Sequence, residues 1–309
     1  MRKSKIIRQD ISQQRKPTAK HIILDVFDKK EIMPFRFPLI TKPVDCNSSK
    51  GVKIAYNVNE LEKFFYEAKE LSRTKTAIIE EYIAGEEITV DAYVEDGKAI
   101  ILSTSISEKI KENDKFVIFR TLNPGKPELL PKIQVVVQQI AEAFNLKNTP
   151  MLIQMLTDGD DVYVIEFSAR TGGGVKHLLI KEVSGFNVIK AVVDLTLGKR
   201  PVVERKARSS CYLVNEFIYC RPGTFDHLEG FEEAKKQGTI ADYYLFKWKG
   251  AEFDTISNSG DRVAGFTIVG NSLEELNQKH NSFNSSFSIV DTDDSDMARH
   301  DLLTEIEPF

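Results

Sequence analysis

Acidic and amide side chains are spaced along one stretch of the chain in a way that suits a metal and phosphate site. Residues 154–174 read as two strands joined by a tight turn, Asp158-Gly159-Asp160-Asp161. Gln154 and Glu166 lie twelve positions apart across this turn, so an antiparallel hairpin brings both side chains to one cleft. A carboxylate and an amide oxygen are hard ligands that magnesium accepts alongside nucleotide phosphates. A polar cross-strand pair on a solvated face explains the same spacing equally well.

The second strand of this hairpin continues the polar pattern. Glu166, Ser168 and Arg170 alternate, and residues two apart in a strand share a face. The residues between them are expected to point into a core: Ile165, Phe167 and Ala169. Arg170 keeps its proton and suits an anionic group, and the glycines at 172–174 let backbone approach that group closely. The alternative is a glycine-rich turn beside an exposed arginine.

A lysine and a loop of small residues form a second candidate site. Lys42 lies near the end of a strand predicted over residues 38–44, and residues 45–51 follow as a loop able to offer backbone N–H groups to phosphates. The GxxxxGK[ST] pattern of a Walker loop is absent. A surface lysine before a turn is the alternative interpretation.

The segment 78–90 predicts a nucleotide-binding hinge. Two strands meet at Ala84-Gly85, where exposed backbone groups can pair with an adenine edge. Glu87 then accepts hydrogen bonds from ribose hydroxyls. By itself the segment is an acidic strand, turn and strand.

The elements that must position these residues alternate between helix and strand. Asn57 with Glu60 forms a capping box for a helix to about residue 72. Up to residue 197, strands are predicted at 21–26, 77–83, 88–95, 99–105 and 115–121, with a hairpin at 95–98, and helices at 131–144, 175–183 and 187–197. Beyond residue 204, strands at 210–218, 243–247 and 263–269 and helices at 229–237 and 273–283 predict a separate α+β appendage, with an exposed acidic segment at 291–296.

Composition excludes several classes of protein. With 309 residues and 41% hydrophobic content, the chain can bury a sizeable core and form two domains, or one domain with an appendage. Acidic residues outnumber basic ones by 46 to 42, which argues against a global nucleic-acid-binding surface. The three cysteines form no CxxC pair, so neither a disulfide framework nor a structural zinc site is predicted. No apolar run is long enough for a membrane span or a leader, and a cytoplasmic location is expected.

The candidate sites occur in one order: Lys42 with its loop, the hinge at 80–87, Gln154 before Glu166, and Arg170 before glycines. In this order, residues 3–203 resemble the ATP-grasp superfamily, and within it the carboxylate–amine ligases related to carbamoyl-phosphate synthase large subunits and biotin carboxylases. The resemblance implies an α+β, ATP-grasp fold in which two α+β subdomains clamp ATP. It divides the chain into an N-terminal helix or linker (1–17), a lid with the hinge (18–87), a central subdomain with the metal site (88–203) and a small α+β C-terminal domain (204–309).

The resemblance also implies roles for individual residues. Nucleotide and phosphate contacts fall on Lys42, Ser48, Ser49, Lys50, Gly51, Glu80, Glu81, Tyr82, Ile83, Glu87 and Gln154. Among these, Glu81 and Ile83 pair with adenine through backbone and Glu87 holds the ribose. Metal ligands fall on Gln154, Glu166 and Ser168, and the catalytic residues are Arg170 and Lys42.

The implied enzyme uses ATP with Mg²⁺, or Mn²⁺ in its place, to activate a small carboxylate as an acyl phosphate for attack by an amine. Two departures from the family pattern matter: Ser168 replaces the usual asparagine, and the usual N-terminal domain before the first phosphate-contacting lysine, here Lys3 or Lys5, is missing. A separate N-terminal domain or subunit, or a homodimer, is therefore an expected partner. The alternatives are a nucleotide-binding subunit or pseudo-enzyme that needs a partner domain, and a bicarbonate-using carbamoyl-phosphate or carboxylase-type enzyme.

Further basic residues are candidates for contacts with an anionic substrate, although a solvated charged face explains most of them equally well. They are Lys109, Lys111, Lys115, Arg120, Lys176 and His177.

Overall fold

The computed structural model describes residues 18–46, 49–110, 117–204 and 211–309. Predictions that concern the linker at 1–17 with Lys3 and Lys5, and those for Ser48, Lys111 and Lys115, lie outside the described residues. In chain order the elements are β1 (His21–Leu24), α2 (Lys29–Ile32), β2 (Leu39–Pro43), β3 (Lys53–Ala55), α3 (Val58–Leu71), β4 (Ala77–Glu81), β5 (Glu86–Glu95), β6 (Lys98–Lys109), β7 (Ile118–Asn123), η2 (Pro127–Leu129), α4 (Leu130–Ala143), β8 (Thr149–Thr157), β9 (Val162–Ser168), α5 (Lys176–Ser184), α6 (Val188–Thr196), β10 (Tyr212–Ile218), β11 (Gly223–Glu229), α7 (Phe231–Gln237), β12 (Asp242–Leu245), β13 (Glu252–Phe253), η3 (Ser259–Asp261), β14 (Ala264–Gly270), α8 (Leu273–Asn284), β15 (Ser288–Asp291) and η4 (His300–Leu302).

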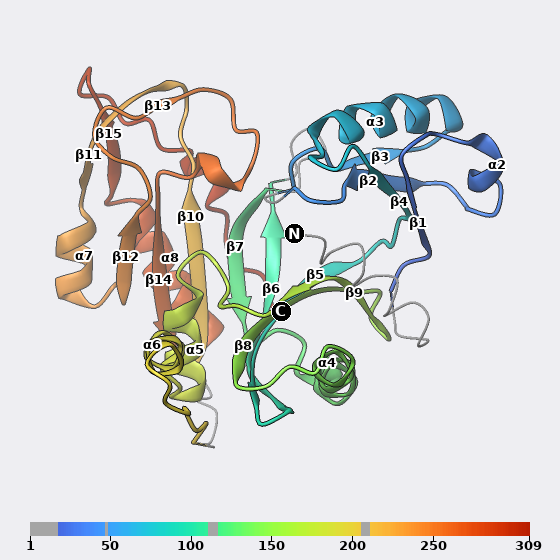
Figure 1. Cartoon of the computed structure of the whole chain (residues 1–309). Helices are drawn as coiled ribbons and strands as arrows, with labels where there is room; N and C mark the ends of the chain where they lie inside the picture. The colour runs from blue at the N-terminus through green and yellow to red at the C-terminus, as the bar shows by residue number, and fades with distance from the viewer. Residues whose placement is uncertain (1–17, 47–48, 111–116, 205–210) are drawn as a thin grey trace.

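A small antiparallel sheet with the strand order β1-β4-β2-β3, here called the lid sheet, carries α3 on one side (Figure 1). Asn57 caps α3 as predicted, because its side chain accepts from the backbone N–H of Glu60. The second bond of the predicted capping box is displaced by one residue, because the Glu60 carboxylate accepts from the backbone N–H of Tyr56 rather than from that of Asn57. Leu61 and Phe65 of α3 are fully buried against the sheet. The helix therefore forms where its cap and its apolar face coincide.

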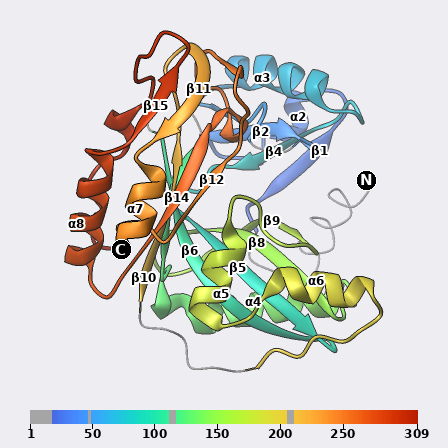
Figure 2. The ribbon, with the colours of Figure 1, turned by 90° about the vertical axis from the view of Figure 1, so that its left-hand side faces the viewer.

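The second sheet, here called the central sheet, has the order β12-β14-β10-β7-β6-β5-β8-β9. Alternation along β5 sends Val90 and its even-numbered neighbours into a core with α4, whose Ile133 and Val137 are fully buried. The odd-numbered residues face the other side, where α5 and α6 cover the lower part of the sheet (Figure 2). The upper part of that side faces the lid sheet.

The C-terminal part of the chain continues the central sheet. β10 pairs with β7, which places Asn215 opposite Thr121, and β14 and β12 follow outward. The strands and helices predicted for this part are present. The prediction that they form a separate appendage is wrong, because β10, β14 and β12 belong to the central sheet. This part has its own core around Phe266 and Phe283, and β11, β13 and β15 form a third sheet at its outer side (Figure 1). Pairing between β7 and β10 joins segments far apart in sequence, which local patterns do not reveal.

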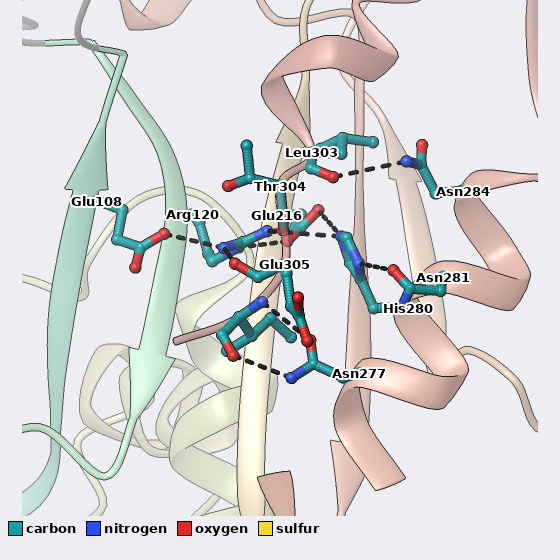
Figure 3. Close-up of polar contacts among 11 residues, drawn as sticks. Glu108, Arg120, Glu216, Asn277, His280, Asn281, Asn284, Leu303, Thr304 and Glu305 are labelled. Atoms are coloured by element: carbon teal, nitrogen blue, oxygen red, sulfur yellow. Dashed lines mark hydrogen bonds and ion pairs between the residues drawn. The ribbon is translucent and has the colours of Figure 1, made fainter. Parts of the chain in front are cut away.

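A buried polar cluster lies where these parts meet, and we call Arg120, Glu216 and His280 the Arg120 cluster (Figure 3). The prediction that Arg120 contacts an anionic substrate is wrong, because its fully buried side chain points to the α8 side of the sheet. Its guanidinium donates to Glu216, to the Glu108 carboxylate at 3.0 Å and to the backbone carbonyl of Thr304. His280 of α8 lies 3.1 Å from the second Glu216 oxygen. The cluster thus fastens the C-terminal segment to β7 and β10 with its charges compensated.

All three cysteines are free thiols, as expected. Within the described ranges, no helix combines the length and apolar character that crossing a bilayer requires.

Candidate functional site

A cleft of about 420 Å³ opens between the lid sheet and the central sheet. The lid contributes Lys42, Lys50 and Tyr82, and the central sheet contributes Glu87 and Gln154. Candidate residues that are remote in sequence therefore share one cavity. Further predicted residues that line it are Ser49, Glu80, Ile83 and Glu166.

The hairpin of β8 and β9 forms as predicted and places Gln154 directly opposite Glu166. The register shifts between Gln154 and Met155, so one extra residue of β9 is accommodated at this point. Ile165 consequently lines the cleft together with Glu166 and Phe167, and Phe167 also packs on Phe144 with ring centroids 4.8 Å apart. The expectation that Ile165 points into a core is wrong because of this bulge, and Ala169 is exposed beyond the end of the strand.

Glu87 lies at the centre of a polar group on the cleft wall. The Gln154 amide nitrogen donates to one Glu87 oxygen at 2.7 Å, and the Lys109 ammonium lies 2.7 Å from the other. Because the amide nitrogen of Gln154 is engaged by Glu87, its carbonyl oxygen is the atom left for a ligand. The same contacts mean that a ribose hydroxyl would share Glu87 with two existing partners.

The lid side of the cleft carries its own ion pair. The Lys42 ammonium pairs with the Glu80 carboxylate, and both side chains are largely buried. Ser49 and Lys50 reach the cleft from the following turn, but Gly51 faces Pro43 and Leu71 instead. Lys42 and Lys50 thus bring two ammonium groups to one side of the cavity.

The hinge joins the lid sheet to β5 along the cleft wall. The backbone N–H groups of Glu81 and Tyr82 already donate to the carbonyls of Lys20 and Pro38, at 2.9 and 3.1 Å. Pairing of Glu81 with adenine would therefore use its carbonyl. At Gly85 a Cβ would lie 2.0 Å from the Thr157 carbonyl oxygen, so only glycine lets the hinge approach β8 this closely.

Ser168, a predicted metal ligand, and Arg170, a predicted catalytic residue, lie outside the lining of the cavity. Ser168 pairs with Leu152 at the end of β9, and its carbonyl accepts from the Arg170 backbone N–H at 2.9 Å. The Arg170 side chain is exposed and donates to the Thr171 carbonyl at 2.7 Å. The roles of Ser168 as a metal ligand and of Arg170 in catalysis stay predictions.

Residues with small hydroxyl side chains lie on the part of the central sheet that faces the lid sheet. Thr89, Ser107 and Thr121 line the cavity, and we call them the cleft floor. Ser107 lies opposite both Glu87 and Thr121 in the sheet register, so the floor continues across β5, β6 and β7. These residues were not predicted from the sequence, although alternating serines in β6 are a visible signal of a polar face.

A buried acid and a buried lysine stand beside the floor. Lys176, one of the predicted anion contacts, lines the cavity and donates to the Ser105 hydroxyl. Burial lowers the pKa of the Lys176 ammonium, and the Asp91 and Glu87 carboxylates oppose that shift. Burial raises the pKa of the Asp91 carboxyl, against the opposing effects of Lys176 and a hydrogen bond from Ser103. Asp91 was missed, although an acid inside the apolar β5 pattern is a signal.

The C-terminal part contributes an arginine that the sequence analysis also missed. Arg262 lines the cavity, and its guanidinium lies over the rings of Phe217 and Phe246, at 4.6 and 4.8 Å. Nothing local marks it, because only the pairing of β10 with β7 brings it to the cleft. His177, by contrast, does not line the cavity, and its ring lies 6.2 Å from that of Tyr244.

The donor set fits a magnesium ion that is shared with phosphates. In the described part of the chain, no group of three or more His, Cys, Asp or Glu side chains could hold a metal ion by itself. Glu166 and Gln154 offer a carboxylate and an amide oxygen, which are hard ligands but only part of a coordination shell. Magnesium bound with a nucleotide takes its remaining ligands from phosphate and water, so this pair suits it.

Part of the chain is similar to known proteins. The ATP-grasp domain family matches residues 35–177. The carbamoyl phosphate synthase large chain of Clostridium acetobutylicum is 29% identical over 168 residues, which is 53% of this chain and 15% of that protein. The D-alanine–D-alanine ligase of Petrotoga mobilis is 32% identical over 155 residues, or 47% of this chain and 50% of that protein.

A solved structure extends the likeness in fold. The L-amino acid ligase from Bacillus licheniformis matches with a TM-score of 0.75 and 21% identity, over 94% of this chain and 72% of that chain. The match spans 15% of the length of the carbamoyl phosphate synthase and 50% of that of the D-alanine–D-alanine ligase. The predicted ATP-grasp fold is confirmed, and residues 35–177 of this chain match the ATP-grasp domain family.

Proposed function

We propose that the chain is an ATP- and Mg²⁺-dependent carboxylate–amine ligase. The observation that carries the proposal is the pairing of Glu166 with Gln154 in the same cavity as Lys42. A carboxylate, an amide oxygen and an ammonium group then face one space from two sheets. The ligase relatives matched above support the same reaction class.

The charges in the cleft suit the binding of a nucleoside triphosphate. Lys42 and Lys50 would contact phosphates from the lid, and Glu166 with Gln154 would hold Mg²⁺ on the opposite wall. When bound, Mg²⁺ neutralises phosphate charge during transfer. The apolar side chains of Leu156 and Ile165, which also line the cavity, offer surfaces for an adenine ring.

The reaction follows from the weak electrophilicity of a carboxylate. A carboxylate oxygen attacks the γ-phosphorus, the bond to the bridging oxygen breaks, and ADP leaves. The amine nitrogen then attacks the carbonyl carbon of the acyl phosphate, inorganic phosphate leaves with that oxygen, and the nitrogen loses a proton. Lys42 would offset charge during the transfer, and we propose the same role for Arg170, which precedes the cavity-lining Gly172.

Closure of the lid sheet over the central sheet would exclude water from this intermediate. The hinge at residues 82–85 is the covalent connection on which the lid would move. A further domain, a separate subunit or a second copy of the chain would complete the substrate side.

The test is phosphate release from ATP and magnesium chloride across panels of amino acids and dipeptides. Wild type is expected to release phosphate with at least one acid and amine together, and Glu166→Ala should lower the rate about a hundredfold or more. Glu233→Ala, which changes an exposed glutamate of α7, is the matched control. Circular dichroism should show both variants folded.

An undiminished rate of phosphate release in Glu166→Ala would contradict the assignment of the metal site. Stabilisation of wild type by ATP without phosphate release in any panel would instead indicate a nucleotide-binding subunit. Incorporation of carbon-14 bicarbonate into product would indicate the carbamoyl-phosphate or carboxylase type.

A further inference from the structure

We propose that the inner end of the cleft, between Arg262, the glycines at 172–174 and the cleft floor, is a subsite for a carboxylate that does not react. This inference rests on the proposed function and deepens it. One of the two substrates would carry this second carboxylate: the amine as an amino acid, or the acid as a dicarboxylate. The proposal stands on three features of the described residues.

The first feature is the way Arg262 is held. Its guanidinium lies over Phe217 and Phe246, and it lines the cavity with Phe217. Among the residues that the structure describes, no carboxylate forms an ion pair with it. Two aromatic faces fix the plane of the guanidinium, which leaves its N–H edge for a planar anion. A carboxylate matches that edge with two parallel hydrogen bonds.

The second feature is the glycine segment that borders the subsite. A Cβ at Gly174 would lie 3.1 Å from an Arg262 guanidinium nitrogen, and one at Gly172 would lie 3.0 Å from an Asp91 oxygen. A Cβ at Gly173 would meet nothing within 4 Å. The segment thus passes between Arg262 and the buried Asp91 while it keeps open space at its centre. Side chains at these positions would fill the space that a substrate needs.

The third feature is a set of buried polar atoms without partners. The hydroxyls of Ser107 and Thr121 and one oxygen of Asp91 have no hydrogen-bond partner among the described residues. Ser107 is 7% exposed and Thr121 is 3% exposed, and both line the cavity. Buried polar groups are normally paired, so unpaired ones that face a cavity indicate a polar ligand.

The charged side chains around the subsite indicate that the ligand is an anion. Lys176 and Arg262 both line this end of the cavity, and Lys176 already interacts with Asp91 and Glu87. Arg262 is therefore the cation that an incoming anion would neutralise. Neutral hydroxyls on the floor can donate to the same anion or accept from an ammonium group beside it.

The experiment measures phosphate release with substrates that differ only in the second carboxylate. On the amine side, each active amino acid is paired with its α-carboxamide, and on the acid side each active dicarboxylate is paired with its half-amide. Wild type should prefer the carboxylate form about tenfold or more on one side, which identifies the substrate that occupies the subsite. Arg262→Gln should raise KM for that form about ten- to a hundredfold, with KM for ATP within about twofold. Arg262→Lys should restore part of the loss.

Arg200→Gln, which changes an exposed arginine 3.6 Å from Asp96, is the control and should leave both constants unchanged. The proposal is overturned if wild type shows no preference on either side, or if Arg262→Gln raises KM for ATP instead of that for the carboxylate.

If wild type releases no phosphate at all, the proposed function fails, and calorimetric titration of the same compounds decides the subsite. The subsite is supported if wild type releases heat of binding with the carboxylate compound but not with its amide, and if Arg262→Gln releases none with either. Equal heats of binding for wild type and Arg262→Gln overturn the proposal.

Discussion

Two neighbouring strands of the central sheet present opposite kinds of polar group on their two faces. On the α8 side, Arg120 and Glu216 are fully buried and compensated within the Arg120 cluster. On the lid side lie Thr121, which follows Arg120 on β7, and Asn215, which precedes Glu216 on β10. Each of these two residues has a polar side-chain atom without a hydrogen-bond partner among the described residues. Burial is equally deep on both faces, so the difference lies only in whether partners are supplied.

This contrast distinguishes buried polar groups that stabilise the fold from buried polar groups that are available to a ligand. A buried cluster with every charge paired holds distant segments together, and a ligand would find no free atom in it. A buried surface with unpaired hydroxyls costs stability unless something else pairs them. The paired charges of the Arg120 cluster attach the C-terminal segment, and the unpaired hydroxyls face the cleft.

The largest effect is expected in the Arg120 cluster. Glu216→Leu leaves the Arg120 guanidinium buried without its main partner, and the free energy of unfolding should fall by about 3–5 kcal/mol. Urea denaturation measures the change. Because an apolar pair removes both charges, the double variant Arg120→Met/Glu216→Leu should recover most of the loss. A double variant as unstable as the single one would show that the paired charges are not what matters.

Two threonines on one row of the sheet allow a smaller, matched test. Thr121 has no partner for its hydroxyl, whereas the Thr267 hydroxyl donates to Asn215 at 2.6 Å. Thr121→Val should leave the free energy of unfolding unchanged or raise it by up to about 1 kcal/mol, and Thr267→Val should lower it by about 1–2 kcal/mol. Thermal unfolding of both variants gives the comparison. Equal losses at the two positions would mean that Thr121 is paired after all.

The smallest effect concerns pH and α8, the helix that carries His280. Glu275 accepts hydrogen bonds from Asn271 and pairs with Lys279, and the contact with the Asn271 backbone N–H is the main reason that its pKa falls to about 2. A pKa below the unfolded value of 4.5 means that this contribution is complete above pH 4.5 and is lost as pH falls toward 2. Glu275→Gln should therefore reduce the difference in Tm between pH 6 and pH 3, and an unchanged difference would contradict the assignment.

Much of the geometry of the cleft could be predicted from the sequence because its signals are local. The turn at 158–161 predicts the hairpin of β8 and β9, and the capping residue Asn57 fixes the start of α3. The bulge in β9 then brings Glu166, rather than Ile165, opposite Gln154. Periodicity then identifies most of the strands and helices. The order of these signals was enough to predict the ATP-grasp fold.

The rest depends on contacts that no local pattern shows. The role of Arg262 depends on the pairing of β10 with β7, and the burial of Arg120 depends on which face of β7 meets α8. The position of Ile165 depends on a single bulge in β9. Short strands such as β11 and β15 lack a clear alternation and were missed for the same reason.

The most direct test of the proposed reaction follows an oxygen atom. The acid that supports phosphate release is labelled with oxygen-18 in its carboxylate, and the released phosphate is analysed by mass spectrometry. Activation as an acyl phosphate predicts one labelled oxygen in each phosphate that accompanies an amide product. Amide formation with unlabelled phosphate would contradict the account, because the carboxylate oxygen would then never have been joined to phosphorus.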